Sequence, residues 1–115
     1  MAPIVEQSEQ PEVYAIDYDK LYRAVAVAES TYKGKPCNTP WHKAANNCVS
    51  IMSWAGGRRH LKKFSSIEAN KQEFKRIWIK GYGDHLPTLR EAIKYTGNDK
   101  ARGWLNNVKS YYFSH

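Results

Sequence analysis

The sequence predicts one α+β domain that is mainly helical and carries a small β-hairpin. Apolar residues recur at helical spacing in several segments, and Gly56-Gly57 separates two short segments of strand character. A chain of 115 residues can bury one hydrophobic core but is too short for a second domain. We therefore expect a single domain over residues 13–115. Residues 1–12 contain Pro3 and Pro11 and little apolar periodicity, which predicts a flexible N-terminal arm.

The first predicted helix begins at Asp17 and ends near Ser30. Asp17 suits the N-cap position, and Asp19 places a second carboxylate in the first turn, where the helix dipole favours it. The alanines and leucine that follow favour the helix interior, and Gly34 offers a stop after it.

Glu29 lies at the end of the apolar face of this helix. Ala26, Val25, Tyr22 and Leu21 precede it at intervals of three, four, seven and eight residues, so the carboxyl shares their stripe. Burial and the negative end of the helix dipole would both raise its pKa, as a general acid requires. The alternative is that the last turn frays and that Glu29 is a solvated surface residue.

The segment 31–47 after this helix is long, irregular and rich in Gly, Pro and Asn, which is typical of a functional or braced loop. A disulfide between Cys37 and Cys48 would brace it and contribute about 3 kcal/mol in the chain-entropy model, and would indicate an oxidising compartment. Two free thiols are the alternative. A zinc site is disfavoured because only His42 lies between the cysteines and no CxxC motif occurs.

The second half of the chain predicts a hairpin and three helices. Residues 48–54 and 58–64 form the hairpin strands around the glycine pair. A capping box from Ser65 to Glu68 opens a helix that continues to Gly81. Pro87 is expected as the first residue of the next helix, which ends at 96–98, and the last helix starts near Asp99.

The net charge of +7 favours an anionic partner such as nucleic acid, an anionic membrane surface or a bacterial cell wall. Basic residues cluster at 58–63 and 71–80 without the dense runs of a nucleic-acid-binding arm, which disfavours nucleic acid. No apolar run approaches the roughly 20 residues that span a bilayer, so we expect no membrane span. The first residues lack the pattern of a signal peptide.

Two short motifs stand out: 26–30, Ala-Val-Ala-Glu-Ser, and 50–53, Ser-Ile-Met-Ser, which is similar to a Gly-Leu-Met-Gln turn. Together they resemble the transglycosylase branch of the lysozyme superfamily, in particular compact soluble lytic transglycosylase (SLT-type) domains. The resemblance covers roughly residues 17–113. Ser50 and Ser53 depart from the Gly and Gln of the family pattern, and 95–98 matches its tyrosine-containing region loosely.

The resemblance implies a lysozyme-like fold and a peptidoglycan-cleaving enzyme. Glu29 would be the general acid and base at the β-1,4 bond between N-acetylmuramic acid and N-acetylglucosamine. The substrate's N-acetyl group would replace a second carboxylate and leave a 1,6-anhydro sugar. A carboxylate that positioned water would instead make the enzyme a hydrolysing muramidase, but Asp84, Glu91 and Asp99 all suit capping or solvated positions. Predicted substrate-binding residues are Ser30, Ser50, Ile51, Met52, Ser53, Tyr82, Tyr95 and Tyr111.

Other features of the sequence complete this interpretation. Trp78 and Trp104 are expected in the core, and the basic residues at 58–63 on a solvated hairpin edge. The histidines lack ligand spacing, so we expect no metal, and we expect no other cofactor. We predict a monomer in the cell envelope or outside the cell: periplasmic, secreted or associated with a phage virion. A non-catalytic peptidoglycan-binding module and a small basic nucleic-acid-binding domain are the alternatives.

Overall fold

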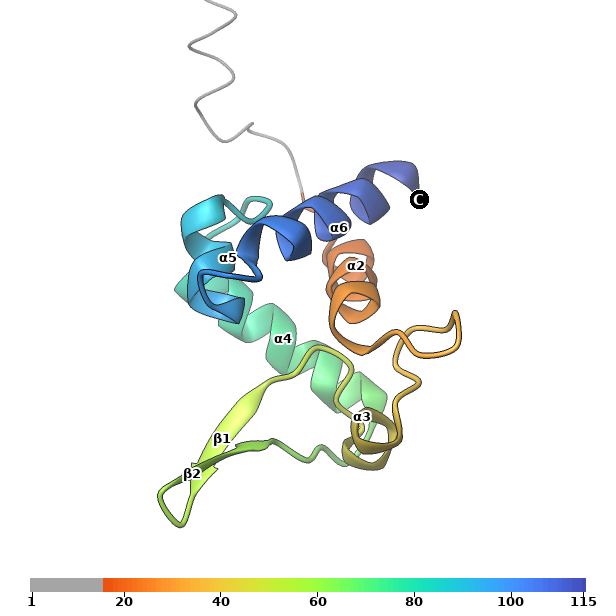
Figure 1. The fold of residues 1–115 in the computed structure, drawn as a ribbon, viewed down its shortest axis with the longest axis vertical. Coiled ribbons are helices and arrows are strands. Elements are labelled where there is room, and N and C mark those ends of the chain that lie inside the picture. Colours follow the sequence, from red (N-terminus) through yellow and green to blue (C-terminus); the bar gives the residue numbers. More distant parts are fainter. Residues whose placement is uncertain (1–15) are drawn as a thin grey trace, which may run out of the picture.

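The structure, a computed structural model, describes residues 16–115, so the predicted arm over residues 1–12 lies outside the described residues. The elements follow in the order α2 (Tyr18–Ser30), α3 (Pro40–Ala45), β1 (Met52–Ala55), β2 (Arg58–Leu61), α4 (Ile67–Gly81), α5 (Leu89–Thr96) and α6 (Ala101–Ser114). The predicted α+β, mainly helical class is confirmed. Figure 1 shows the hairpin extending from the helical part of the molecule on the side far from α6.

The four longer helices enclose the hydrophobic core. Helix α2 packs against α6 and α4, and α5 packs against α6. Leu21 and Val25 of α2, Phe74 and Trp78 of α4, and Val108 of α6 are all almost completely buried. These positions recur at helical spacing because one face of each helix is turned to the core. The burial of their apolar side chains is the main source of stability in such a fold.

The start of α2 is the predicted one, whereas the starts of the later helices differ from the predictions by a residue or two. Asp17 is the N-cap of α2, as expected, and its carboxylate accepts a hydrogen bond from the Lys20 N–H. Helix α4 is capped by Ser66 rather than Ser65, so no Ser65–Glu68 capping box forms. The box occurs instead at α5, between Thr88 and Glu91.

Two further boundaries correct the sequence interpretation. Pro87 precedes the N-cap of α5 and is not its first helical residue, because the Thr88 hydroxyl provides the stronger cap. Helix α6 begins at Ala101 after Lys100, not at Asp99.

Helix α3 was not predicted, because the segment 31–47 was expected to be irregular throughout. Thr39 is its N-cap and accepts a hydrogen bond from the His42 N–H, and Pro40 occupies the first turn. Asn46 ends the helix in the left-handed conformation. The Thr-Pro start and the Asn end are ordinary helix signals that were present in the sequence.

The hairpin is antiparallel, as predicted, but its strands are shorter than expected. Met52 pairs with Leu61 and Ala55 with Arg58. Gly56 and Gly57 connect the strands with positive φ angles of 59° and 74°, which suits the primed turns that join two-residue hairpins.

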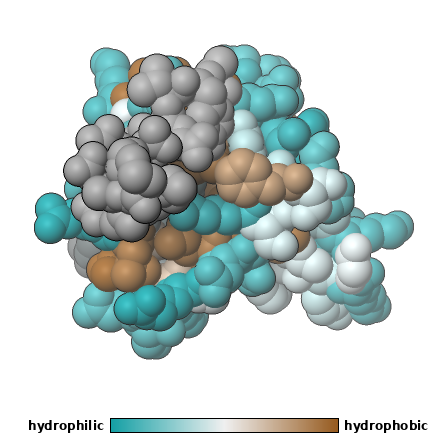
Figure 2. All heavy atoms as spheres, turned by 90° about the horizontal axis from the view of Figure 1, so that it is seen from above, coloured by the Kyte–Doolittle hydropathy of each residue, from teal (hydrophilic) through white to brown (hydrophobic). Residues whose placement is uncertain are grey.

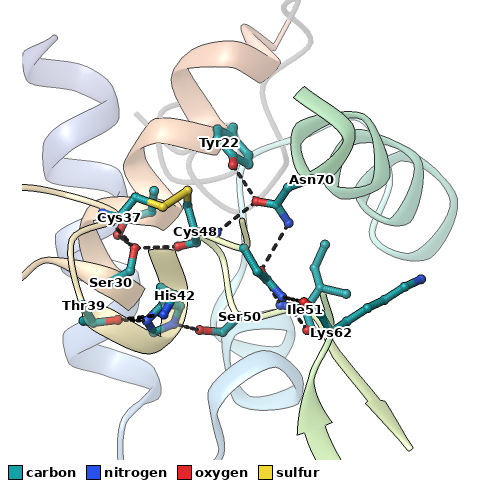
Figure 3. Close-up of a disulfide and its surroundings, with 12 residues drawn as sticks. Tyr22, Ser30, Cys37, Thr39, His42, Cys48, Ser50, Ile51, Lys62 and Asn70 are labelled. Atoms are coloured by element: carbon teal, nitrogen blue, oxygen red, sulfur yellow. Dashed lines mark hydrogen bonds between the residues drawn. A yellow bond between two sulfur atoms is a disulfide. The ribbon is translucent and has the colours of Figure 1, made fainter. Parts of the chain in front are cut away.

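The segment 31–51, which we call the braced loop, connects α2 to the hairpin. The predicted disulfide between Cys37 and Cys48 is present and joins two positions within this loop. The buried Asn70 of α4 holds the loop from the other side: its amide oxygen accepts from the Cys48 N–H at 3.0 Å and from the Tyr22 hydroxyl. Its amide nitrogen donates to the Asn47 side chain. Figure 3 shows Asn70 between Tyr22 and Cys48.

The visible surface in Figure 2, apart from the grey residues, is mostly hydrophilic with small separate hydrophobic areas. Among residues 16–115, no helix has the length and apolar character required to cross a membrane.

Candidate active site

Glu29 occupies the last turn of α2, and its neighbour Ser30 fixes that turn to the braced loop. The Ser30 side chain is 1% exposed. Its hydroxyl lies 2.7 Å from the Cys48 carbonyl oxygen, to which it donates, and it accepts from the Cys37 N–H at 3.1 Å. Figure 3 shows this contact beside the disulfide. The end of α2 is therefore fixed and has not frayed, and Glu29 is half-buried rather than fully solvated.

The Glu29 side chain lines a cleft of about 450 Å³. We call this the Glu29 cleft. Its lining combines the end of α2, the start of the hairpin and one face of α5 and α6. The residues that line it are Ala28, Glu29, Ser50, Met52, Arg59, Tyr95, Thr96, Lys100, Trp104 and Asn107.

A second pocket, of about 210 Å³, continues the cleft along the hairpin and α4. It adds Ile51, Trp78, Tyr82 and Lys94 to the lining. Because the two pockets share Ser50, Met52, Arg59 and Tyr95, they form one groove with Glu29 in one part of it. An extended ligand can therefore lie across the acid.

The environment of Glu29 raises the pKa of its carboxyl above the usual value. Burial is the largest cause, because removal from water disfavours the charged form. The Ser50 hydroxyl, the Trp104 indole N–H and the charge of Lys100 act in the opposite direction and favour the carboxylate. The site thus provides an acid that holds its proton to a higher pH than usual, with donors ready for the carboxylate once the proton has left.

Trp104 contributes an unsatisfied polar atom to the cleft. The residue is 6% exposed, and its indole Nε1 has no hydrogen-bond partner of normal geometry within the described part of the chain. Buried N–H groups are rarely left unpaired. We predicted Trp104 in the core, and it is buried there, but its N–H also faces the carboxyl of Glu29.

Ser50 is linked to a buried histidine. The His42 Nε2 atom lies 2.9 Å from the Ser50 hydroxyl, and His42 Nδ1 contacts the Thr39 hydroxyl. Figure 3 shows the imidazole between these two side chains. Burial lowers the pKa of His42, so the imidazole tends to be neutral.

Tyr95 lies between the Glu29 cleft and the core. Its hydroxyl donates to the carbonyl oxygen of Val49, and its ring stacks on Trp104 with centroids 5.1 Å apart. Burial, followed by the nearby charge of Glu29, raises the pKa of Tyr95 well above its usual value. The phenol is therefore neutral, and it fixes the backbone just before Ser50.

The structure brings together some of the predicted substrate-binding residues and not others. Ser50, Met52 and Tyr95 line the Glu29 cleft, and Ile51 and Tyr82 line the adjoining pocket. Ser53 and Tyr111 line neither, and the Tyr111 ring stacks on His115. The buried Ser30 also lines neither pocket, and its hydroxyl bonds to the braced loop instead.

Two of the three other carboxylates considered in the sequence have structural contacts, and the third is exposed. Asp84 accepts from the Tyr18 hydroxyl at 2.7 Å. Glu91 completes the cap of α5, and Asp99 is exposed. Among residues 16–115, Glu29 is the one carboxylate in the lining of its cleft.

Several site residues were missed from the sequence. Arg59, assigned to a solvated hairpin edge, is exposed but lines both pockets. Lys100 and Asn107 gave no motif, and His42 was considered only as a metal ligand. Local spacing could not have found them, since Arg59, Lys100 and Asn107 reach the Glu29 cleft only after the chain has folded. His42 likewise contacts Ser50 only in the folded loop.

No group of three or more His, Cys, Asp or Glu residues within residues 16–115 is arranged to hold a metal ion. That the protein uses no metal or other cofactor stays a prediction.

Comparison of the chain with protein-family models, with curated proteins and with solved structures finds no match.

Proposed function

We propose that this protein is a peptidoglycan-cleaving glycosidase, either a lytic transglycosylase or a muramidase, with Glu29 as its general acid and base. The observation that carries the proposal is a half-buried carboxyl with a raised pKa in a cleft large enough for a sugar ring. The resemblance of segments 26–30 and 50–53 to lytic transglycosylases supports peptidoglycan as the substrate and supports membership of the lysozyme superfamily.

The reaction needs a proton first and a base second. Glu29 donates its proton to the glycosidic oxygen, the bond from that oxygen to C1 breaks, and the substrate's acetamido oxygen bonds to C1. The Glu29 carboxylate then removes the proton of the C6 hydroxyl, whose oxygen displaces the acetamido oxygen and closes the 1,6-anhydro ring. If water takes the place of the C6 hydroxyl, the product is a reducing sugar.

The lining of the groove supports the transglycosylase course over a two-carboxylate mechanism. Ordinary glycosidases pair two carboxyl groups across the bond that they cleave. Residues 16–115 contribute only Glu29 to the lining of the Glu29 cleft. A substrate that uses its own acetamido group has no need of the second.

The charge of the groove supports an anionic glycan such as a peptidoglycan strand with its peptide carboxylates. Arg59, Lys94 and Lys100 line it, and none of the three forms an ion pair with another residue of 16–115. Such charges attract an anionic polymer at long range. The disulfide fits a compartment outside the reducing cytoplasm, and we place the protein in the cell envelope or outside the cell, acting as a monomer.

Digestion of purified peptidoglycan tests the proposal. Wild-type protein is expected to release muropeptides, and Glu29→Gln to lose about 10²–10⁴-fold in rate, because the amide cannot transfer the proton. Mass spectrometry identifies the course, since the anhydro and reducing products differ by one water.

Glu68→Gln is the matched control, because it neutralises an exposed carboxyl on α4 away from the groove. It is expected to digest like the wild type. Binding without digestion by the wild type would contradict the proposed function and favour a binding module. Equal digestion by Glu29→Gln and Glu68→Gln would contradict the role of Glu29 as the general acid.

A further inference from the structure

Ser50 has an unusual backbone conformation for a residue with a side chain. Its φ is 60°, in the left-handed region that glycine adopts more readily. The segment around it is held firmly: the Ile51 N–H donates to the Asn47 side chain, and the disulfide fixes Cys48. A glycine would meet this backbone requirement at lower cost, so the serine hydroxyl needs an explanation of its own.

That hydroxyl ends a chain of hydrogen bonds that starts in the braced loop. The Thr39 hydroxyl oxygen accepts from the His42 backbone N–H at 3.0 Å, which leaves its proton to be donated to His42 Nδ1. We assign the imidazole proton to Nε2 on this basis. The Nε2–H then donates to the Ser50 oxygen at 2.9 Å.

The remaining proton in the chain is that of Ser50, whose side chain lines the same cleft as Glu29. With its oxygen already accepting from His42, the Ser50 hydroxyl is free to donate toward the Glu29 carboxyl, whose ionised form it favours. In this arrangement each donor points toward the Glu29 cleft, from Thr39 through His42 to Ser50. The opposite tautomer of His42 would turn the Ser50 proton away from Glu29.

We propose that His42 is a positioning residue for Glu29, and that it acts through the Ser50 hydroxyl to orient and stabilise the carboxylate left after proton transfer. His42 is 6% exposed and lines neither of the two pockets, so it cannot touch a substrate there itself. The mechanistic role rests on the proposed function, whereas the hydrogen-bond chain itself does not.

Other groups also influence the carboxyl of Glu29 and must stay constant in a test. Lys100, before α6, and the Trp104 N–H favour the carboxylate. Arg59 of β2 and the neutral Tyr95 of α5 complete the titratable lining of the Glu29 cleft. Variants at Ser50 and His42 leave all four in place, so they report on the chain of hydrogen bonds alone.

NMR spectroscopy tests this chain without any assay of activity. In the wild type, ¹⁵N chemical shifts are expected to show a neutral His42 protonated at Nε2. The ¹³C titration of the Glu29 carboxyl is expected to move to higher pH in Ser50→Gly by about 0.5–1 pH unit, the worth of one lost hydrogen bond. A smaller shift in the same direction is expected for His42→Gln.

Ser50→Gly suits this test because glycine adopts the left-handed conformation without strain and the fold should be retained. Ser53→Ala removes a hydroxyl that lines neither pocket and should leave the titration unchanged. A His42 protonated at Nδ1, or an unmoved Glu29 titration in Ser50→Gly, would overturn the proposal.

Peptidoglycan digestion by the same variants separates this proposal from the proposed function. If the wild type digests peptidoglycan, the alkaline limb of the pH–rate profile should move upward with the Glu29 titration in Ser50→Gly. A uniform loss of rate at all pH values would contradict a positioning role. If the wild type does not digest peptidoglycan while the titration still moves, the proposed function fails and the hydrogen-bond chain stands.

Discussion

The helical part of the molecule and the braced loop are stabilised by different kinds of contact. The helices bury continuous apolar faces, with Leu21, Phe74 and Trp78 at the centre of the core. The braced loop depends instead on a disulfide and on buried amide groups such as that of Asn70. Glu29 lies where the two regions meet, on the last turn of α2. The next residue, Ser30, is hydrogen-bonded to backbone groups of both cysteines.

Because of this difference, one region mainly determines the stability of the fold and the other mainly determines the geometry of the site. Apolar contacts tolerate small adjustments of side chains, whereas hydrogen bonds among buried groups fix both distance and direction. The helices therefore supply most of the stability, and the braced loop sets where Ser50 and His42 lie relative to the acid. Mutations in the two regions should consequently affect stability and activity in different proportions.

The largest effect on stability is expected from the helical core. Phe74 is 2% exposed, and its ring lies between Tyr22 and Trp78, with centroids 5.6 Å away in both cases. Phe74→Ala should lower the free energy of unfolding by about 3–5 kcal/mol, because it removes apolar contacts and leaves a cavity. Denaturant unfolding measures this change.

Phe113→Ala is the matched control, since that ring is 67% exposed on α6. Its expected effect lies within about 0.5 kcal/mol. Similar losses for the two variants would show that the core does not dominate stability as described.

The second effect concerns the disulfide and is expected to act on both stability and activity. Replacing Cys37 and Cys48 together by serine should lower the free energy of unfolding by about 3 kcal/mol, because the unfolded chain regains the freedom of the closed loop. Peptidoglycan digestion should fall further than the folded fraction accounts for, since the loop carries His42 and Ser50. Unfolding curves and digestion rates from the same samples measure both.

A comparison of the oxidised and reduced wild-type protein provides the control, because it breaks the same bond without changing the sequence. Helical content in circular dichroism should persist in both if the helices fold on their apolar contacts. Full activity in the reduced state would contradict the role given to the braced loop.

The contrast between the helical part and the braced loop also explains how much of the fold was predictable from the sequence. Helices α2, α4 and α6 and the hairpin follow from apolar spacing and from Gly56-Gly57, since those patterns are local. Helix α3 escaped notice although Thr39 and Pro40 mark its start, because the surrounding composition indicated a loop. The shift of the α4 cap to Ser66 reflects two adjacent serines with equal capping ability.

The site was predictable only where it depends on a local pattern. The half-buried position of Glu29 follows from its place on the helix stripe, and the disulfide from the short interval between the cysteines. The approach of Lys100 and Trp104 to Glu29 joins segments far apart in the chain. The contact of His42 with Ser50 spans eight residues, but it depends on how the loop between them folds. No spacing in one sequence encodes such contacts.

The smallest of these effects is a pH-dependent change in stability caused by Glu29 itself. Burial raises the pKa of Glu29, so the folded state holds this proton more tightly than the unfolded state does. Below the ordinary glutamic acid pKa both states are protonated, and Glu29 has no effect of this kind. As the pH rises, the unfolded chain ionises first, and the wild type loses stability until the folded carboxyl has ionised as well.

Glu29→Gln removes this penalty because the amide does not titrate. The variant should therefore gain stability relative to the wild type as the pH rises from acid to neutral, with the direction of the change more informative than its size. Unfolding free energies measured across this range provide the test, with Glu68→Gln as the control at an exposed position. A wild type that gains stability relative to Glu29→Gln over the same range would mean that the donors around Glu29, and not its burial, dominate the site. In that case the carboxyl would be ionised too readily to serve as a general acid near neutral pH.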